Sequence, residues 1–97
     1  MEITREQIGT MLVIKLKGKL DTYTAPALDA ELKKGLDGVK ELYWDFSELD
    51  YMTSAGIREL LIARNMLGDD STMKVIHANE AISNALYLTG FTDLLGE

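Results

Sequence analysis

The chain has 97 residues, of which 46% are hydrophobic, and its 16 acidic and 10 basic residues give a formal net charge of −6. This length suits one compact domain with one core, which we assign to residues 1–97, and the acidic balance disfavours binding to nucleic acids or anionic membranes. With no cysteine, a single histidine, no apolar run of membrane-spanning length and no secretory signal, the sequence predicts a cytoplasmic protein without disulfides, metal ligands or a bound cofactor.

Two strands are expected at the start of the chain. Residues 2–8, EITREQI, read as a short strand, and residues 11–20, MLVIKLKGKL, as a second strand in which apolar residues recur at every other position. Gly9 and Thr10 lie between them and are typical of a tight turn. We therefore expect an antiparallel hairpin.

A helix is expected next. Thr24 can cap it, and Pro26 suits its first turn, where the missing N–H is no loss. Leu28, Leu32 and Leu36 recur every fourth residue and form one stripe, which is expected to face the core.

A strongly apolar strand follows at residues 39–47, VKELYWDFS. From Leu42 to Phe46 its residues are nearly all apolar or aromatic, which is typical of a strand that helices cover on both faces. We therefore expect it at the centre of the sheet.

The pattern becomes helical again from about residue 55 to residue 67. One side of this helix is small and apolar and is expected to pack inward: it comprises Gly56, Leu60, Ala63 and Leu67. The other side is polar and carries Arg58, Asn65 and Asp69. Ile62 lies on this polar side, where it is either an ordinary exposed residue or, with Met66 nearby, an apolar contact point for a partner.

The last strand is expected at residues 73–78, MKVIHA, followed by a helix at residues 80–90. Asn79 is a suitable N-cap for this helix and Gly90 a suitable stop. The residues expected to face inward are Ile82, Ala85, Leu86 and Leu88. Residues 91–97, FTDLLGE, then close the chain as an apolar clamp.

The order of these elements predicts an α/β domain: a mixed, mostly parallel sheet of about four strands, an N-terminal antiparallel hairpin, and three or four covering helices. In such sheets the loops after the strand C-termini gather at one edge, where ligands and partners usually bind. Two of these loops lead into helices here, at residues 20–26 and 47–56.

The small residues 53–56, TSAG, lie where the second loop enters its helix. Ser54 can cap the helix, while Ala55 and Gly56 allow a close approach to other backbone. Alternatively, Ser54 carries a phosphate, whose charge of about −1.5 to −2 would reverse an interaction at this loop. A free nucleotide is disfavoured because the chain has no glycine-rich phosphate loop.

A catalytic serine is also disfavoured. A nucleophile elbow has a glycine two residues before the serine, and Met52 occupies that position. His77, the only possible histidine base, is expected to be an ordinary, partly buried residue. The acidic residues between positions 29 and 50 form either a solvated surface or a docking surface for a basic protein.

Three blocks of the sequence resemble the STAS domain family: GKLDTYTAPAL at residues 18–28, DFSELDYMTSAGIRELL at residues 45–61 and ALYLTGFTDLL at residues 85–95. Their order and spacing match that family over nearly the whole chain, and the middle block is the most specific. The chain is similar to a stand-alone anti-sigma factor antagonist.

This resemblance implies a STAS fold and a bacterial phosphoprotein that regulates transcription by partner switching. In that family the unphosphorylated antagonist binds an anti-sigma factor and so frees a sigma factor. The anti-sigma factor is also a serine kinase that holds the ATP, and it ends the binding by phosphorylating a loop serine of the antagonist. A serine phosphatase restores the active form, so the antagonist itself is expected to be no enzyme.

For the site, the resemblance implies that Ser54 is the phosphoacceptor. Thr53 stands where the family often has aspartate, and its hydroxyl makes it a second candidate. Asp21 matches the family's aspartate in the loop after the second strand, although an aspartate before a helix can also serve a turn. The expected partner-binding residues are Asp21, Thr22, Thr53, Ser54, Ala55, Gly56, Arg58 and Ile62.

An alternative function remains open. The chain is then a STAS interaction module of a stress-signalling scaffold or of a lipid or anion transport complex. In that case the same edge binds a protein, and phosphorylation is optional.

Overall fold

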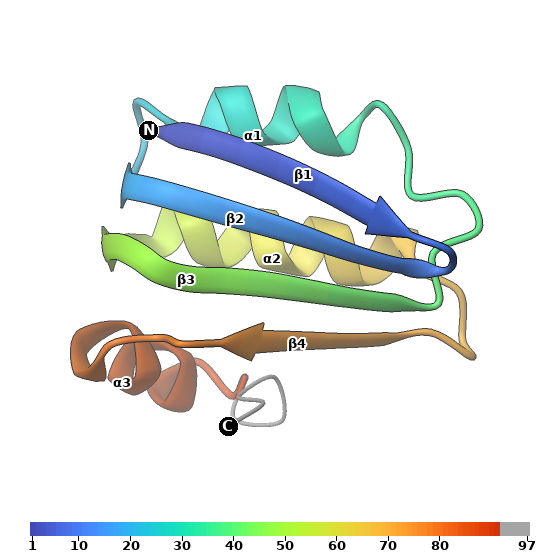
Figure 1. Ribbon diagram of the computed structural model, residues 1–97. Helices are drawn as coiled ribbons and strands as arrows, with labels where there is room; N and C mark the ends of the chain where they lie inside the picture. The colour runs from blue at the N-terminus through green and yellow to red at the C-terminus, as the bar shows by residue number, and fades with distance from the viewer. Residues whose placement is uncertain (92–97) are drawn as a thin grey trace.

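The computed structural model describes residues 1–91, which form a four-stranded sheet and three helices (Figure 1). In chain order the elements are β1 (Glu2–Ile8), β2 (Met11–Leu20), α1 (Ala25–Leu32), β3 (Glu41–Met52), α2 (Ser54–Met66), β4 (Thr72–Ile76) and α3 (Glu80–Leu88). The strands lie in the order β1-β2-β3-β4; β1 and β2 pair antiparallel, and the other pairs are parallel. The predicted α/β fold is confirmed.

The hairpin follows from alternation and from one glycine. In β2 the side chains of Leu12, Ile14 and Leu16 are fully buried, while the residues between them are partly exposed. Gly9 has a φ of 61° in the two-residue connection, a conformation that costs glycine little. The hairpin therefore turns tightly and presents one apolar face of β2 to the core.

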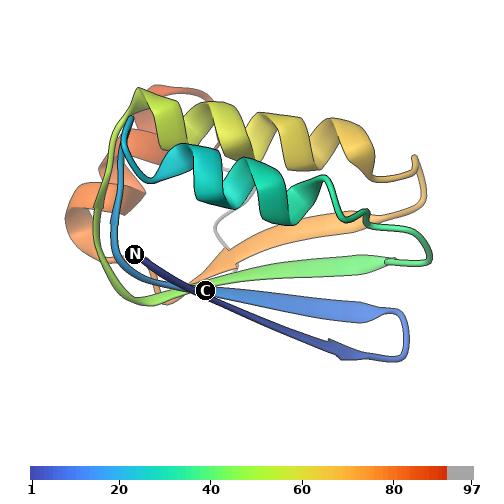
Figure 2. The same ribbon diagram turned by 90° about the horizontal axis from the view of Figure 1, so that it is seen from above.

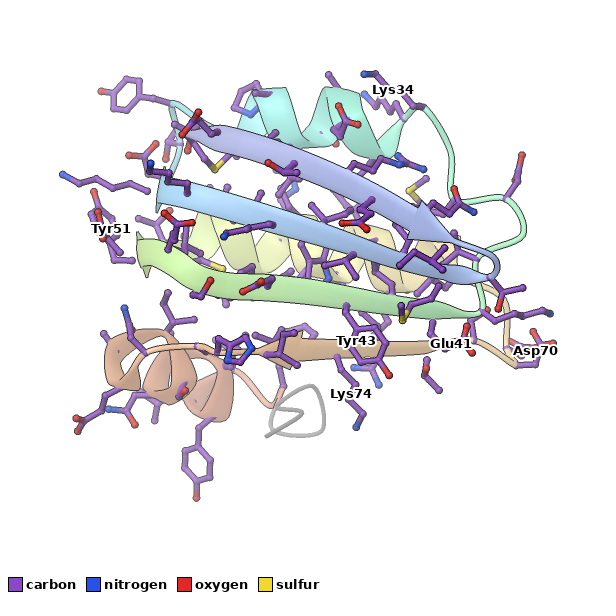
Figure 3. The ribbon with its side chains drawn as sticks, viewed as in Figure 1. Lys34, Glu41, Tyr43, Tyr51, Asp70 and Lys74 are labelled. Carbon is purple, nitrogen blue, oxygen red and sulfur yellow. The ribbon has the colours of Figure 1, made fainter. Side chains whose placement is uncertain are left out.

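The helices cover the sheet unevenly. α1 and α2 both lie on one face (Figure 2), and β3 alternates between buried residues such as Leu42 and Trp44 and half-buried ones such as Tyr43. Tyr43 and its neighbour Lys74 on β4 share the open face (Figure 3). The prediction that helices cover both faces of this strand was wrong. Tyr43 counts as apolar, and this masked the alternation of buried and half-buried residues that is typical of a strand with one open face. Its central position, between β2 and β4, is confirmed.

β3 is also longer than predicted. It continues to Met52 and pairs with β2 as far as Leu20, with two register shifts on the way. The predicted loop at residues 47–56 is therefore wrong: only Thr53 separates β3 from α2. The polar residues Ser47 and Glu48 suggested a loop, but they lie exposed on a strand whose buried positions continue at Leu49 and Met52.

Two helices are shorter than predicted. α1 ends at Leu32, and Leu36 reaches the core from the segment after the helix. α3 ends at Leu88, whose side chain is 81% exposed and not inward as predicted, while Ile82 and Leu86 are buried. The N-cap at Asn79 is confirmed: its side chain accepts a hydrogen bond from the Ile82 N–H at 2.9 Å.

The C-terminal part of the chain is described only up to Phe91, which packs against the core. The rest of the predicted apolar clamp lies outside the described residues. Among residues 1–91, no helix is both long and apolar enough to cross a membrane.

Candidate functional site

The two segments predicted to form the site meet at one edge of the sheet. β2 ends at Leu20 and β3 at Met52, which are paired, and the Thr53 N–H donates to the Leu20 carbonyl at 3.0 Å. Figure 3 shows Tyr51 at this edge, with Glu41 and Asp70 at the opposite end of the sheet. The loop after β2 and the start of α2 are thus side by side, as predicted.

Asp21 organises the loop before α1. Its Oδ1 accepts hydrogen bonds from the N–H groups of Tyr23 at 2.9 Å and Thr24 at 3.0 Å. The Thr24 hydroxyl makes no capping bond, in contrast to our prediction, and donates instead to the Lys19 carbonyl at 2.8 Å. The bond from the Thr24 N–H is the main reason that the pKa of the Asp21 carboxyl lies below its ordinary value. Asp21 therefore serves the turn.

Ser54 is the first residue of α2 and is exposed. Thr53, in an extended conformation, is the N-cap, and its carbonyl accepts from the Gly56 and Ile57 N–H groups at 2.9 and 3.2 Å. The predicted cap by the Ser54 hydroxyl is absent: within residues 1–91 that side chain makes no hydrogen bond. The Thr53 Oγ1 is buried and has no partner among the described residues. The two candidate hydroxyls thus differ, one facing solvent and one facing inward.

Gly56 explains why the junction needs small residues. A Cβ at this position would lie 2.8 Å from two side-chain carbons of Leu20 and would collide with Cγ of Met52. We predicted a close approach to other backbone at this position, and this was wrong: the close neighbours of Gly56 are the side chains of Leu20 and Met52. Because Gly56 is buried, it shapes the surface beneath Ser54 and is not itself a contact residue.

The outer face of α2 differs from the prediction at one position. Arg58 and Asn65 are exposed as predicted, but Ile62 is half-buried and packs against the core. A hollow of about 350 Å³ lies between α1 and α2, and its lining comprises Thr22, Ala25, Pro26, Asp29, Ala55, Arg58, Glu59 and Ile62. Four of the predicted partner-binding residues, Thr22, Ala55, Arg58 and Ile62, thus share one surface depression.

Glu59 is a residue of this hollow that the sequence reasoning missed. Its side chain is only 6% exposed, and burial, followed by the nearby Asp29 carboxylate, raises its pKa. The Asp29 carboxylate accepts from Lys33 Nζ at 2.8 Å, and this bond lowers the pKa of Asp29. The signal was available: Glu59 lies three residues after Gly56 and four before Ala63, on the inward side of the helix.

The remaining candidates lie elsewhere. His77, after β4, has a φ of 60° and is exposed, not partly buried as predicted. Within residues 1–91, no three His, Cys, Asp or Glu side chains gather in a way that could hold a metal ion.

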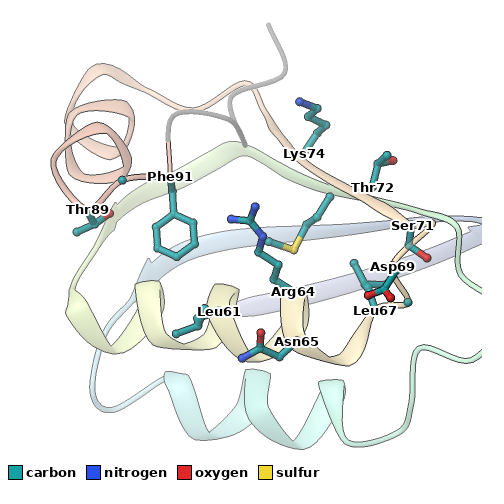
Figure 4. Close-up of a pocket in the computed structure, with 13 residues that line it drawn as sticks. Leu61, Arg64, Asn65, Leu67, Asp69, Ser71, Thr72, Lys74, Thr89 and Phe91 are labelled. Atoms are coloured by element: carbon teal, nitrogen blue, oxygen red, sulfur yellow. The ribbon is translucent and has the colours of Figure 1, made fainter.

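A larger hollow, of about 680 Å³, lies by the C-terminal half of α2 and β4 (Figure 4). Arg64, Lys74 and Phe91 are among its lining residues, and it contains none of the predicted site residues. We therefore place the candidate site at the smaller hollow and the adjoining Ser54 edge.

Comparison with protein families and curated proteins gives a consistent result. The family model of the STAS domain matches residues 2–96. BtrV of Bordetella bronchiseptica, named as a candidate anti-sigma factor antagonist, is 28% identical over 96 residues, which cover 97% of this chain and 83% of BtrV. The anti-sigma-B factor antagonist of Staphylococcus aureus is 27% identical over 84 residues, covering 84% of this chain and 78% of that protein.

Solved structures show the same fold. Unphosphorylated SpoIIAA, an anti-sigma factor antagonist, superposes with a TM-score of 0.86 at 18% identity, covering 97% of this chain and 85% of SpoIIAA. An anti-sigma factor antagonist from Mycobacterium paratuberculosis also gives a TM-score of 0.86, at 24% identity and with 98% of this chain and 82% of that chain covered. SpoIIAA in its phosphorylated form gives 0.78 at 18% identity, with 97% of this chain and 88% of that chain covered.

Proposed function

The chain belongs to the STAS domain family, and from this premise we propose that it is an anti-sigma factor antagonist, the role for which its curated relatives are named. In its unphosphorylated form it binds an anti-sigma factor and so releases a sigma factor. That partner is a serine kinase which uses its own ATP to phosphorylate Ser54, and the phosphate ends the binding. A serine phosphatase reverses the step, and the whole exchange takes place in the cytoplasm.

The observation that carries this proposal is the position of Ser54. Its hydroxyl belongs to an exposed residue at the first position of a helix, on the edge where the loop after β2 lies beside the start of α2. A kinase needs an acceptor that reaches its active site, and the buried Thr53 Oγ1 meets that need less well. We therefore assign the phosphate to Ser54 and treat Thr53 as the residue that begins the helix.

The electrostatics of the edge support a switch of this kind. N–H groups and the macrodipole at a helix N-terminus favour negative charge, so a phosphate on Ser54 is compatible with the fold. The same phosphate adds about −1.5 to −2 charge at a surface that already carries Asp21. A partner matched to the unmodified edge then meets a dianion, and binding is lost while the domain stays folded.

The exposure of the eight proposed partner-binding residues indicates which of them can contact a partner. Thr22, Ser54 and Arg58 are exposed, and Asp21, Ala55 and Ile62 are half-exposed, so these six residues make the contacts. The remaining two members, Thr53 and Gly56, set the geometry of the helix start. The chain thus serves as a regulatory module, and its own residues hold no nucleotide.

The first test is a phosphosite map by mass spectrometry of the protein purified from its own cells, grown with and without stress. We expect phosphate on Ser54 whose occupancy changes with the growth condition. Capture experiments with Ser54→Ala and Ser54→Asp, side by side, should retain a kinase-type anti-sigma factor only on the alanine variant. If neither hydroxyl is ever modified and both variants capture the same protein, the chain is a constitutive docking module of a scaffold or transport complex.

A further inference from the structure

The hollow between α1 and α2 combines an apolar wall with an acidic floor. Ala25, Ala55 and Ile62 contribute apolar surface to its lining, and Asp29 and Glu59 contribute carboxyl groups from the two helices. Thr22 and Ala55 belong to the same edge as Ser54, so the hollow continues the proposed partner surface. It therefore lies where a docked protein would cover it.

Glu59 is unusual within this hollow. Glu59 is more than nine-tenths buried, and its Oε1 has no hydrogen-bond partner among the described residues. Its carboxyl group does form a hydrogen bond with the Asp29 carboxylate, but this bond needs a proton on Glu59 and is lost when Glu59 ionises. A buried carboxylate without a partner is costly, because neither water nor a counterion compensates its charge. In the isolated domain the Glu59 carboxylate therefore lacks a full counterion, and a positively charged group that entered the hollow would compensate its charge.

The cations around Glu59 meet this demand only in part: Arg58 and Lys33 lower the pKa of Glu59, but burial and the Asp29 carboxylate raise it more. α1 contributes the Asp29 carboxylate, which already accepts from Lys33, a residue whose side chain is 76% exposed. Arg58, next to Glu59 in α2, is exposed, and its charge lowers the pKa of both Asp29 and Glu59. The loop before α1 adds only the neutral Thr22. Both cations thus lie at the solvent-exposed rim, and both carboxyl groups lie below them.

We propose that this hollow receives one basic side chain, a lysine or an arginine, of the protein that docks on the Ser54 edge. The aliphatic stem of that side chain lies along Ala55 and Ile62, and its cationic group lies between the carboxylates of Asp29 and Glu59. This inference rests on the proposed function and adds the chemistry by which the partner is recognised. Recognition of this kind requires an ionised Glu59, and burial makes that ionised form unfavourable in the isolated domain.

Proton release is a consequence that distinguishes this role from a structural one. An incoming cation stabilises the ionised form of Glu59, whose pKa is raised in the isolated domain. Partner binding therefore releases part of a proton and becomes tighter as the pH rises through the pKa of Glu59. Asp29 contributes little, because its pKa is already low.

The test is calorimetric titration of Ser54→Ala and of Ser54→Ala/Glu59→Gln with the anti-sigma factor that the alanine variant captures. In buffers of different ionisation enthalpy, we expect Glu59→Gln to weaken binding at least tenfold and to abolish the proton release. Glu6→Gln is the matched control: Glu6 is exposed on β1, and removing its charge should leave both quantities unchanged. Alanine substitution of each basic residue of the partner should find one whose effect disappears in the Glu59→Gln background.

The outcomes separate the two proposals. If Ser54→Asp abolishes binding while Glu59→Gln binds with unchanged affinity and unchanged proton release, the hollow is not the receptor but the partner switch stands. If Ser54→Ala captures no anti-sigma factor, both proposals fail. Should Glu59→Gln not fold, Asp29→Asn provides the same test from α1, with a smaller expected loss of affinity because Lys33 already shares that carboxylate.

Discussion

The inner side of the first turn of α2 presents Gly56 to Leu20 and Met52, whereas its outer side presents Ser54 to solvent. On the inner side a single added carbon meets the side chains of Leu20 and Met52, which would have to shift, so the packing favours glycine. On the outer side the serine hydroxyl makes no hydrogen bond within residues 1–91, so its chemistry is free to change. The core thus fixes where the serine lies, and solvent exposure leaves it available for modification.

The first prediction concerns a change that disrupts the packing on the inner side of this turn. Gly56→Ala should lower the free energy of unfolding by about 1–3 kcal/mol, because the new Cβ overpacks against Leu20 and Met52. Ser54→Ala, two residues away in the same turn, is the control and should change the stability by no more than about 0.5 kcal/mol. Urea denaturation of both variants makes the comparison, and equal effects would show that the two sides of the turn do not differ.

The second prediction concerns the neighbouring loop. Asp21→Ala should lower the urea midpoint by less than Gly56→Ala does, because the N–H groups of Tyr23 and Thr24 lose their acceptor. Asp21→Asn keeps an acceptor oxygen but loses the charge, so near neutral pH it should be less stable than the parent protein and more stable than Asp21→Ala. The folded pKa of Asp21 is lowered, so the charge of Asp21 stabilises the fold above the unfolded pKa and this gain is lost as the pH falls. The difference between parent and Asp21→Asn should therefore vanish in acid; a constant difference would contradict the assignment.

The third prediction is a small gain in stability. The folded pKa of Glu59 is raised, so the folded state binds more protons than the unfolded state and loses stability as the pH rises through that interval. Glu59→Gln removes this loss and should melt slightly higher than the parent at pH 7.5, with a smaller difference at pH 4.5. Thermal melts at both values test this, and a lower melting temperature for Glu59→Gln at pH 7.5 would show that the carboxylate stabilises the fold.

The fourth prediction has the smallest effect on stability and the largest on binding. Ser54→Asp should leave the thermal melt nearly unchanged, since an acidic group is tolerated at a helix N-terminus. The same variant should lose the anti-sigma factor completely, because the new charge lies at the docking edge. If Ser54→Asp instead unfolds the domain, the Ser54 side chain is required for the fold.

Much of the fold could be predicted because it depends on local periodicity. Alternation in β2, the leucine stripe of α1 and the cap at Asn79 are short-range patterns, and each produced the expected element. Two of the errors arose where one residue satisfies two patterns. Tyr43 counts as apolar in a sequence but lies on the open face, and Leu88 follows the helical stripe yet is exposed at the end of α3.

The position of the site could be predicted from the sequence, but the burial of its side chains could not. Ser54 and Asp21 follow strands whose C-termini must meet at one edge, so their proximity was expected from chain order alone. The burial of Glu59, which lines the hollow between α1 and α2, depends on how closely these two helices pack. No pattern within one segment encodes that distance.

The sequence by itself thus determined the order of the elements, the edge at which the site forms and the residue types available there, because these follow from hydrophobic periodicity and connection rules. The tertiary structure alone decided which hydroxyl faces solvent, why the packing favours glycine at position 56, and which carboxyl groups lie close together between α1 and α2. The physical reason is that burial and electrostatic coupling depend on contacts between residues far apart in the chain, and these exist only once the helices have packed on the sheet.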